Sequence, residues 1–266
     1  MNSNKNNRGF KDVYLGLAGA GLPLFLAKAD IRQRSRRSSL GPFWITISTG
    51  VMIGCIGIIF GNIFKSPIHD FLPFLAAGLI LWSFISTVVI EATTVFTVAE
   101  PIIKQLPLPL FSHVIRMVAR NFYIFLHNIV IYPLVCLVVL RAWGWNVLLV
   151  FPGLVILIVN LLWVSLVLGI ICTRFRDMAQ IVQSVLQIAF YVTPIIWMPS
   201  LLPARASSMI LDPNPVYHLL EVVRAPLMNQ APSLLNWAVS IGVAVAGWVF
   251  TIAVYNRYKH RIAYWL

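Results

Sequence analysis

The sequence predicts an all-α polytopic membrane protein with six transmembrane helices. Of its 266 residues, 59% are hydrophobic and only 11% are charged, whereas charged residues make up about a quarter of a soluble domain. Six long apolar segments occur, with approximate cores at 42–61, 71–96, 114–140, 147–172, 179–198 and 235–256. A helix needs about 20 such residues to cross a bilayer. Composition and segment length therefore exclude a soluble globular domain.

The distribution of cations predicts the orientation. Sixteen of the 20 Lys and Arg residues fall in residues 1–40, in the second-to-third and fourth-to-fifth connections, or after residue 256. Cytoplasmic loops carry an excess of Lys and Arg, so both termini are predicted to be cytoplasmic. The formal charge of +12 is then explained by loops facing anionic lipid, and nucleic-acid binding is not expected. Three regions follow: cytoplasmic residues 1–40, the six-span domain 41–256 and a short cytoplasmic tail 257–266.

The first helix is predicted near the N-terminus, where Phe10, Val13, Tyr14 and Leu17 share one helical face. Three interpretations compete for residues 10–29: a signal peptide, a first span and an amphipathic interfacial helix. Cleavage of a signal peptide would leave a cationic cluster at the new N-terminus, which argues against translocation of that end. A span would be short and broken by glycines. We favour an interfacial helix along the cytoplasmic face.

A cationic hinge precedes the first apolar segment and is predicted to mark the membrane boundary. Each Arg at the centre of a bilayer costs about 2.5–3.5 kcal/mol on the translocon-insertion scale, so this cluster cannot enter hydrocarbon. The hinge comprises Arg32, Arg34, Arg36, Arg37, Gly41, Pro42 and Trp44.

Glycines form one face of the first apolar segment. Gly50, Gly54, Gly57 and Gly61 are spaced by four, three and four residues, which lets another helix approach closely. The partner helix could belong to the same subunit or to a second copy, and the spacing favours neither.

The second apolar segment carries a polar face that includes Ser83, Thr87 and Glu91. Carboxylates within membranes are costly and usually face protein or water, which makes Glu91 a functional candidate. The alternative is that Glu91 lies near the cytoplasmic end, where it is hydrated or paired with a cation. A proton relay with His127 is conceivable, but a packing histidine is favoured.

A proline-bounded elbow connects the second and third apolar segments. Proline fixes the backbone and ends helices, so a short, stiff cytoplasmic connection is predicted, with a simple turn as the alternative. The elbow comprises Lys104, Gln105, Leu106, Pro107, Leu108 and Pro109.

The fifth apolar segment follows a charged turn, Arg174, Arg176 and Asp177, and carries a polar stripe. The stripe consists of Gln180, Gln183, Gln187 and Tyr191. Lipid offers amides no hydrogen-bond partner, so the stripe should face protein or water. It either lines a channel or joins helices together.

The long outer connection, at 200–234, contains a short amphipathic helix. It is too short to span a bilayer and is expected to be re-entrant or to lie against the outer mouth of the bundle. Its candidate functional residues are Asn214, Pro215, Tyr217, Glu221 and Arg224.

Catalytic motifs are absent from the sequence. It contains no GxxxxGK[ST], GxSxG or HExxH pattern. The three cysteines show no metal-binding spacing and are expected to be buried small hydrophobes. A non-catalytic chain without its own cofactor or metal is predicted.

The order and spacing of several motifs resemble the type-2 ABC transporter permeases that export polysaccharides across bacterial inner membranes. These motifs are DIRQRSRRSSLGPFWI, KQLPLPLF, RFRDMAQIV, YVTPIIWMP and NPVYHLLEVVR. The resemblance spans nearly the whole chain and is greatest to exporters of lipid-linked O-antigen. Capsule and teichoic-acid exporters are neighbouring groups.

The resemblance implies a homodimer of six-span subunits in the inner membrane with two separate ATPase subunits, which would bind ATP and Mg. Phe10, Tyr14, Leu17, the elbow and the charged turn would then couple to the ATPase. The polar residues of the second and fifth segments would line a channel for a lipid-linked polysaccharide, and the outer helix would form a gate. Two rival functions are a proton-coupled secondary transporter and a glycolipid transferase in the membrane.

Overall fold

The computed structural model describes residues 8–35, 43–141 and 144–266, and all regular elements in these ranges are helices. The elements are α1 (Arg8–Ala18), α2 (Gly21–Ser35), α3 (Phe43–Ile63), α4 (Ile68–Ala92), α5 (Val95–Val98), α6 (Glu100–Gln105), α7 (Phe111–Asn128), α8 (Ile131–Val138), η1 (Trp145–Leu149), α9 (Val150–Arg174), α10 (Met178–Val192), η2 (Pro199–Leu201), α11 (Ala204–Leu211), α12 (Pro215–Leu227) and α13 (Leu234–Trp265).

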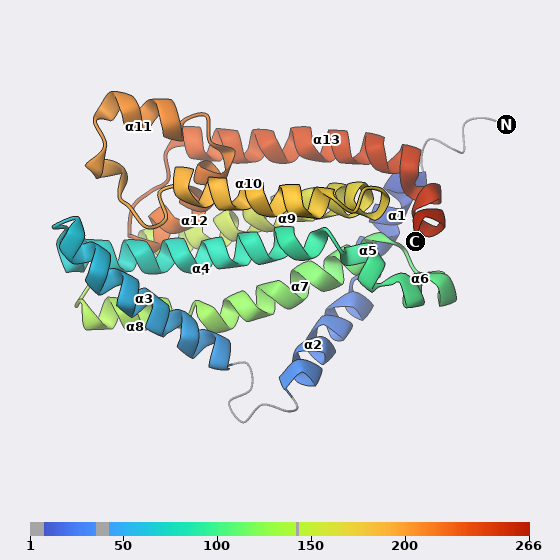
Figure 1. Ribbon diagram of the computed structural model, residues 1–266, viewed down its shortest axis with the longest axis horizontal. Helices are drawn as coiled ribbons and strands as arrows, with labels where there is room; N and C mark the ends of the chain where they lie inside the picture. Colours follow the sequence, from blue (N-terminus) through green and yellow to red (C-terminus); the bar gives the residue numbers. More distant parts are fainter. Residues whose placement is uncertain (1–7, 36–42, 142–143) are drawn as a thin grey trace.

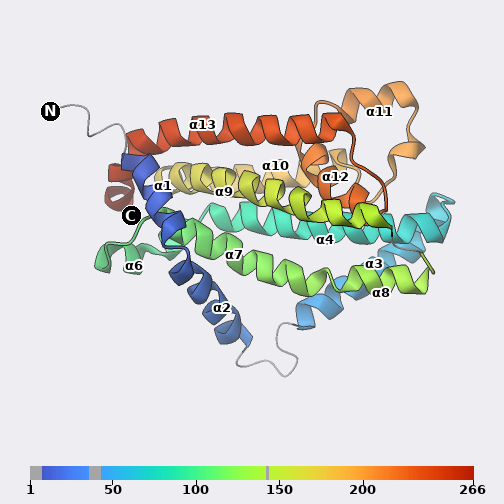
Figure 2. The ribbon, with the colours of Figure 1, turned by 180° about the vertical axis from the view of Figure 1, so that it is seen from behind.

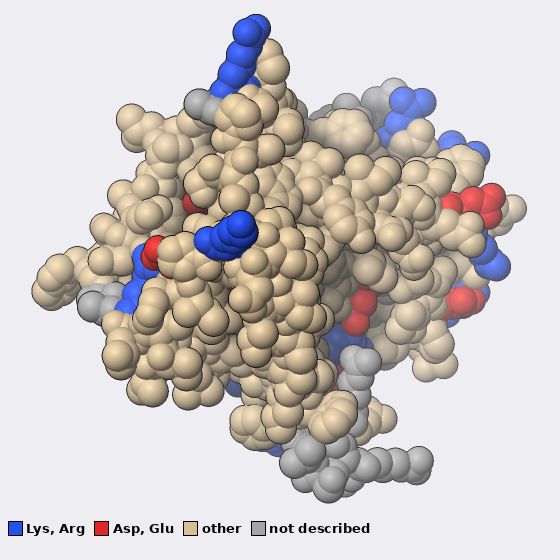
Figure 3. Space-filling view, turned by 60° about the vertical axis from the view of Figure 1, so that its left-hand side comes forward, with Lys and Arg blue, Asp and Glu red and all other residues tan. Residues whose placement is uncertain are grey.

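The long helices run side by side and give the bundle two distinct ends (Figures 1 and 2). Helices α1 and α6 and the C-terminal end of α13 lie at one end, and α11 and α12 lie at the other. Figure 3, in which the end of the bundle with α11 comes forward, shows a largely uncharged face with a few scattered Lys, Arg, Asp and Glu side chains.

Five helical segments are long and apolar enough to cross a membrane. They are Phe43–Ile63, Ile68–Ala92, Phe111–Val138, Trp145–Arg174 and Leu234–Trp265. The pair α1 and α2 also qualifies when taken together, although it is bent by 67°. Helix α10 is apolar but has only 15 residues, about 22 Å of helix. The predicted all-α polytopic class is confirmed, with five to six candidate spans in the described ranges.

Helix α4 forms the centre of the bundle. Its residues from Phe74 to Leu81 are all buried, and it contacts α3, α7, α8, α9, α10 and α12. Helix α9 packs on α4 and also contacts α13 along its length (Figure 2). Burial on every side explains why α4 is apolar around its whole circumference at this level.

Three helix boundaries differ from the sequence-based expectation. The N-terminal region is not one amphipathic helix, because a turn at Gly19 and Ala20 divides it into α1 and α2. The third span is interrupted between α7 and α8, where Pro133 lacks the N–H that would bond to the carbonyl of Ile129. Helix α13 continues to Trp265, so residues 257–265 extend the last helix.

The glycine face of α3 packs within the subunit at one point. A Cβ added to Gly57 would lie 2.5 Å from Leu72 Cδ1 on α4, whereas nothing lies within 4 Å of such an atom at Gly54. Gly57 therefore permits the close α3–α4 contact, and Gly54 has no role in the described packing.

Candidate functional site

Helix α1 packs on α13 and α7 mainly through a face of small and polar residues. Gly9, Asp12, Val13 and Gly16 are buried, whereas Phe10, Tyr14 and Leu17 are exposed. The reason is steric: a Cβ at Gly9 would lie 2.7 Å from the Asn256 side chain, and one at Gly16 would lie 3.2 Å from the Phe111 ring. Of the four apolar residues that share the predicted helical face, Val13 is buried and the other three are exposed. The exposed three are left free to meet lipid or a partner.

The N-terminus of α1 is capped by a distant residue. The backbone amides of Gly9 and Phe10 donate to Asn256 Oδ1 of α13, at 2.7 and 3.2 Å. The first amides of a helix have no partner within the helix, and Asn256 supplies one. This cap holds the start of α1 against α13.

Asp12 is a buried carboxylate that connects three helices, and the sequence analysis did not identify it. It is 4% exposed. Its Oδ1 accepts from Leu110 N at 3.4 Å and lies 2.7 Å from Lys259 Nζ. Its Oδ2 accepts from Phe111 N at 3.0 Å and from the Tyr255 hydroxyl at 2.6 Å. An anion at the first amides of α7 is also favoured by the helix dipole. Asp12 thus joins α1 to α13 and to the start of α7.

The predicted elbow is a short helix followed by an extended segment. Lys104 and Glu100 form an exposed ion pair at 2.6 Å on α6, which is a weak contribution at a surface. From Lys104 to Pro107 the elbow is exposed. It ends at Phe111, which is fully buried. The elbow therefore projects from the bundle while Asp12 anchors its C-terminal end.

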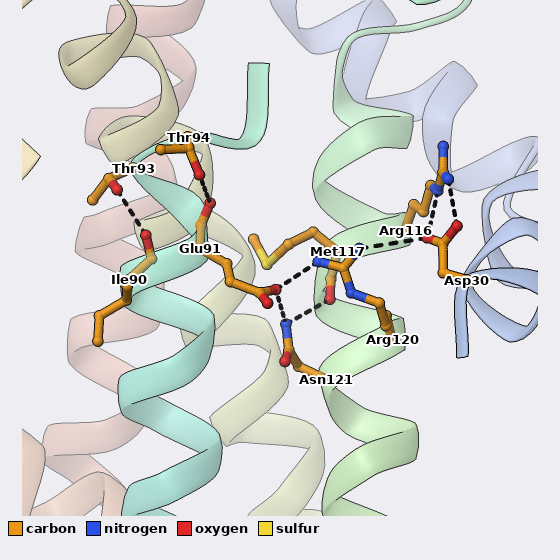
Figure 4. A network of polar contacts seen from close by, with 9 residues as sticks. All are labelled: Asp30, Ile90, Glu91, Thr93, Thr94, Arg116, Met117, Arg120 and Asn121. Atoms are coloured by element: carbon orange, nitrogen blue, oxygen red, sulfur yellow. Dashed lines mark hydrogen bonds and ion pairs between the residues drawn. The ribbon is translucent and has the colours of Figure 1, made fainter. Parts of the chain in front are cut away.

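A network of polar contacts connects α2, α4 and α7 (Figure 4). Glu91 of α4 accepts from Arg120 Nη2 at 2.6 Å and from Asn121 Nδ2 at 2.5 Å. One turn away on α7, Arg116 binds Asp30 of α2 with both Nε and Nη2, at 2.8 and 2.5 Å. Two cations and two carboxylates thus neutralise one another in partly buried surroundings, which is the arrangement that desolvated charges require.

This network bears on the two interpretations of Glu91. Glu91 is paired with a cation near one end of its helix, as the second interpretation held. His127 contacts different groups: its Nδ1 lies 2.7 Å from the Tyr123 carbonyl oxygen, and its ring packs edge-on to Phe43. The described contacts contain no path from Glu91 to His127, and His127 is a packing residue.

Ser83 and Thr87 share a cavity with Glu91. The cavity has a volume of about 190 Å³ and lies between α3, α4 and α7. Asn121 and Asn128 of α7 also line the cavity, whereas none of the glutamines of α10 does. The structure brings together the predicted polar residues of α4 and adds two asparagines, but it does not join them to the α10 stripe.

The cationic hinge is only partly within the described residues. Arg32 and Arg34 belong to the last turn of α2, and Arg32 is exposed. Trp44 is exposed at the start of α3. Arg36, Arg37, Gly41 and Pro42 lie outside the described residues.

The charged turn lies between α9 and α10. Arg174, Arg176 and Asp177 are all exposed. The Arg174 guanidinium lies 5.1 Å from the ring centroids of both Phe175 and Trp265, so the turn is in contact with the end of α13.

The polar stripe of α10 points away from the subunit. Gln180, Gln183, Gln187 and Tyr191 are exposed. On its other side α10 packs on α4, with the Phe190 and Trp82 rings 5.7 Å apart. In the described structure the glutamine side chains join no helices of this subunit, so any role of the stripe in joining helices concerns a contact with a second subunit.

Helix α12 is held in place by a side-chain cap and a buried cation. Asn214 accepts from the amides of Val216 and Tyr217, at 3.0 and 3.2 Å. Arg224 is 1% exposed; it binds Glu221 at 2.6 Å and donates to the Pro194 carbonyl at 2.5 Å. Burial raises the pKa of Tyr217 above its ordinary value.

Comparison with known proteins identifies the family. The ABC-2 type transporter family matches residues 24–228. The chain belongs to this family. An O-antigen export system permease protein RfbA from Klebsiella pneumoniae is 24% identical over 249 residues, which cover 91% of this chain and 93% of the relative. Another from Myxococcus xanthus is 26% identical over 239 residues, which cover 83% and 90%.

The sequence alone did not identify all of the polar residues that join helices in this ABC-2 permease. Arg116 and Arg120, four residues apart, share one face of α7, and Arg120 and its neighbour Asn121 could have been recognised as partners for Glu91. Asp12 carried a weaker signal: it is an acid within an apolar helix, away from the predicted apolar face. Members of this family are transport subunits of the membrane, so these contacts position helices and perform no chemistry.

Proposed function

We propose that this ABC-2 permease forms a homodimer that exports a lipid-linked polysaccharide of the O-antigen type across the bacterial inner membrane. A separate ATPase, in two copies and binding ATP and Mg, supplies the energy. The curated relatives named above are O-antigen export permeases and align over nearly their whole length. The sequence itself contains no P-loop motif.

The proposal of a channel rests on the exposed polar stripe of α10. Gln180, Gln183 and Gln187 are exposed on an apolar helix, and each amide has two donors and an acceptor that lipid cannot satisfy. A second subunit facing this stripe across a water-filled path would satisfy them. Amides in register suit a moving glycan, because each sugar hydroxyl can exchange one weak hydrogen bond for the next. Tyr191 continues the same face and offers a ring for stacking on sugars.

Coupling to the ATPase is assigned to the end of the bundle that carries α1 and α6. Phe10, Tyr14 and Leu17 present an exposed apolar stripe there, and the elbow projects from the same end. Asp12 connects the two elements through the first amides of α7. Force on the elbow would therefore reach α1 and α7 together.

The short helices of the opposite end are assigned to an outer gate. Helix α11 is exposed along much of its length, while α12 packs on α4, α9 and α13. Asn214 also donates to Thr193 Oγ1 at 3.0 Å, close to the end of α10. Because this hydrogen bond joins the end of α10 to the start of α12, a movement of α10 there would displace α12 as well. Proton-coupled transport is disfavoured, because Glu91 is held by Arg120 and Asn121 and not by a titratable relay.

Replacing Gln183 and Gln187 with leucine tests the channel. Each lost hydrogen bond contributes about 0.5–1.5 kcal/mol, so glycan export is expected to slow by about tenfold while the dimer remains intact. The readouts are surface polysaccharide in cells lacking their own permease, and the oligomeric state in detergent. Gln230→Leu, an exposed glutamine of the outer connection, is the matched control. Normal export from a stable dimer would contradict the channel, and dissociation of the dimer would assign the stripe to subunit contact.

A further inference from the structure

A second cavity lies at the end of the bundle that carries the chain termini. It has a volume of about 400 Å³ and is formed where the last turns of α9 meet the last turns of α13. Its lining combines two cations, Arg174 and Arg261, with the aromatic rings of Phe175, Tyr258 and Trp265. The remaining lining residues are aliphatic and belong to the apolar parts of α9 and α13. The cavity therefore has a cationic part and an apolar part.

The two cations of this cavity differ from three cations of α7 and α13 at the same end, which are paired with carboxylates. Arg116 binds Asp30, Arg120 binds Glu91 and Lys259 binds Asp12. Within the described residues, neither Arg174 nor Arg261 forms an ion pair with a carboxylate. No Asp or Glu lines the cavity. Its positive charge is thus uncompensated by the protein.

The geometry of Arg174 favours a ligand with an anionic oxygen. Its guanidinium lies 5.1 Å from the ring centroids of Phe175 and Trp265. Contact with the two rings restrains the side chain, which lowers the entropy that a ligand must overcome. The five N–H donors of a guanidinium match the paired oxygens of a phosphate.

We propose that this cavity binds the headgroup of an anionic phospholipid from the surrounding leaflet. Arg174 and Arg261 would contact the phosphate, and the acyl chains would lie along the aliphatic lining. Basic pockets between transmembrane helices are suited to such headgroups. A free phosphate ion accounts less well for the site, because it would leave the aromatic and aliphatic lining without a partner. The site requires only that the chain lies in a membrane, so it is independent of the exported substrate.

Native mass spectrometry of the full chain in detergent tests the site. Phosphatidylglycerol and phosphatidylcholine with the same acyl chains are titrated separately. We expect one tightly bound phosphatidylglycerol per chain and weaker binding of phosphatidylcholine. Each cation at a membrane surface contributes about fivefold in affinity, so the double variant Arg174→Gln, Arg261→Gln is expected to bind phosphatidylglycerol about 30-fold more weakly.

Two further variants separate charge in the cavity from charge elsewhere and from misfolding. Arg176→Gln removes an exposed cation of the same turn that does not line the cavity, and it should leave binding within about twofold. Arg174→Lys with Arg261→Lys keeps the charge but not the guanidinium geometry, so its affinity for phosphatidylglycerol should lie between those of the wild type and the double Gln variant. Equal phosphatidylglycerol binding by the wild type and the double Gln variant would overturn the proposal. So would equal binding of the two lipids by the wild type, or displacement of the lipid by millimolar inorganic phosphate.

Discussion

Replacing Asp12 with asparagine should release α1 from the start of α7. Each carboxylate oxygen accepts two contacts: Leu110 N and Lys259 Nζ at one, and Phe111 N and the Tyr255 hydroxyl at the other. Asparagine keeps one oxygen and turns the other into a donor, so two of the four contacts are lost. A hydrogen bond to a charged group contributes about 1.5–3 kcal/mol and a neutral one about 0.5–1.5 kcal/mol.

The expected loss in docking free energy is therefore about 2–4 kcal/mol. This loss in docking free energy is no larger than the usual cost of breaking a buried ion pair, about 3–5 kcal/mol. The reason is that the side chain of Lys259 is 29% exposed, so water can replace its carboxylate partner. Tenfold in an equilibrium corresponds to about 1.4 kcal/mol. Amide hydrogens of α1 should then exchange about 30-fold to about 1,000-fold faster.

Hydrogen exchange of the purified full chain measures this change directly. Lys11→Asn is the matched control, because Lys11 is the exposed neighbour of Asp12. It should leave the exchange of α1 unchanged. If Asp12→Asn protects α1 as well as the wild type does, the four contacts do not hold the helix, and the connection between α1 and the elbow is refuted.

Three other predictions concern the network, the elbow and the topology. Glu91→Gln should lower the thermal stability in detergent, by about 1–3 kcal/mol for a carboxylate with a cation and an amide partner; an unchanged melting temperature would contradict its structural role. Replacing Pro107 and Pro109 with glycine should uncouple export from ATP use while the complex still assembles, since the change removes stiffness more than contact area; normal export would rule out a stiff coupling element. In a cysteine-free background, Ser208→Cys should react with an impermeant label added outside intact cells and Tyr264→Cys should not; the reverse result would overturn the predicted orientation.

The sequence by itself determined the helical class, five of the candidate spans and the asymmetry of charge. These properties depend on local composition: a run such as Ile68–Ala92 is apolar over more than a bilayer's thickness whatever its neighbours are. Local patterns also located α12, where Asn214 precedes Pro215 and caps the helix. The polar stripe of α10 was visible from helical periodicity alone.

Only the tertiary structure decided which faces pack and which charges pair. Asp12 meets Tyr255 across 243 residues, and Glu91 meets Arg120 across 29. Periodicity reports which residues share a face, but it does not report which helix covers that face. For α1 the outcome was set by Gly9 and Gly16, whose lack of a side chain lets α13 and α7 approach closely. The larger apolar residues were therefore left outside, because close packing of backbones favours the small face.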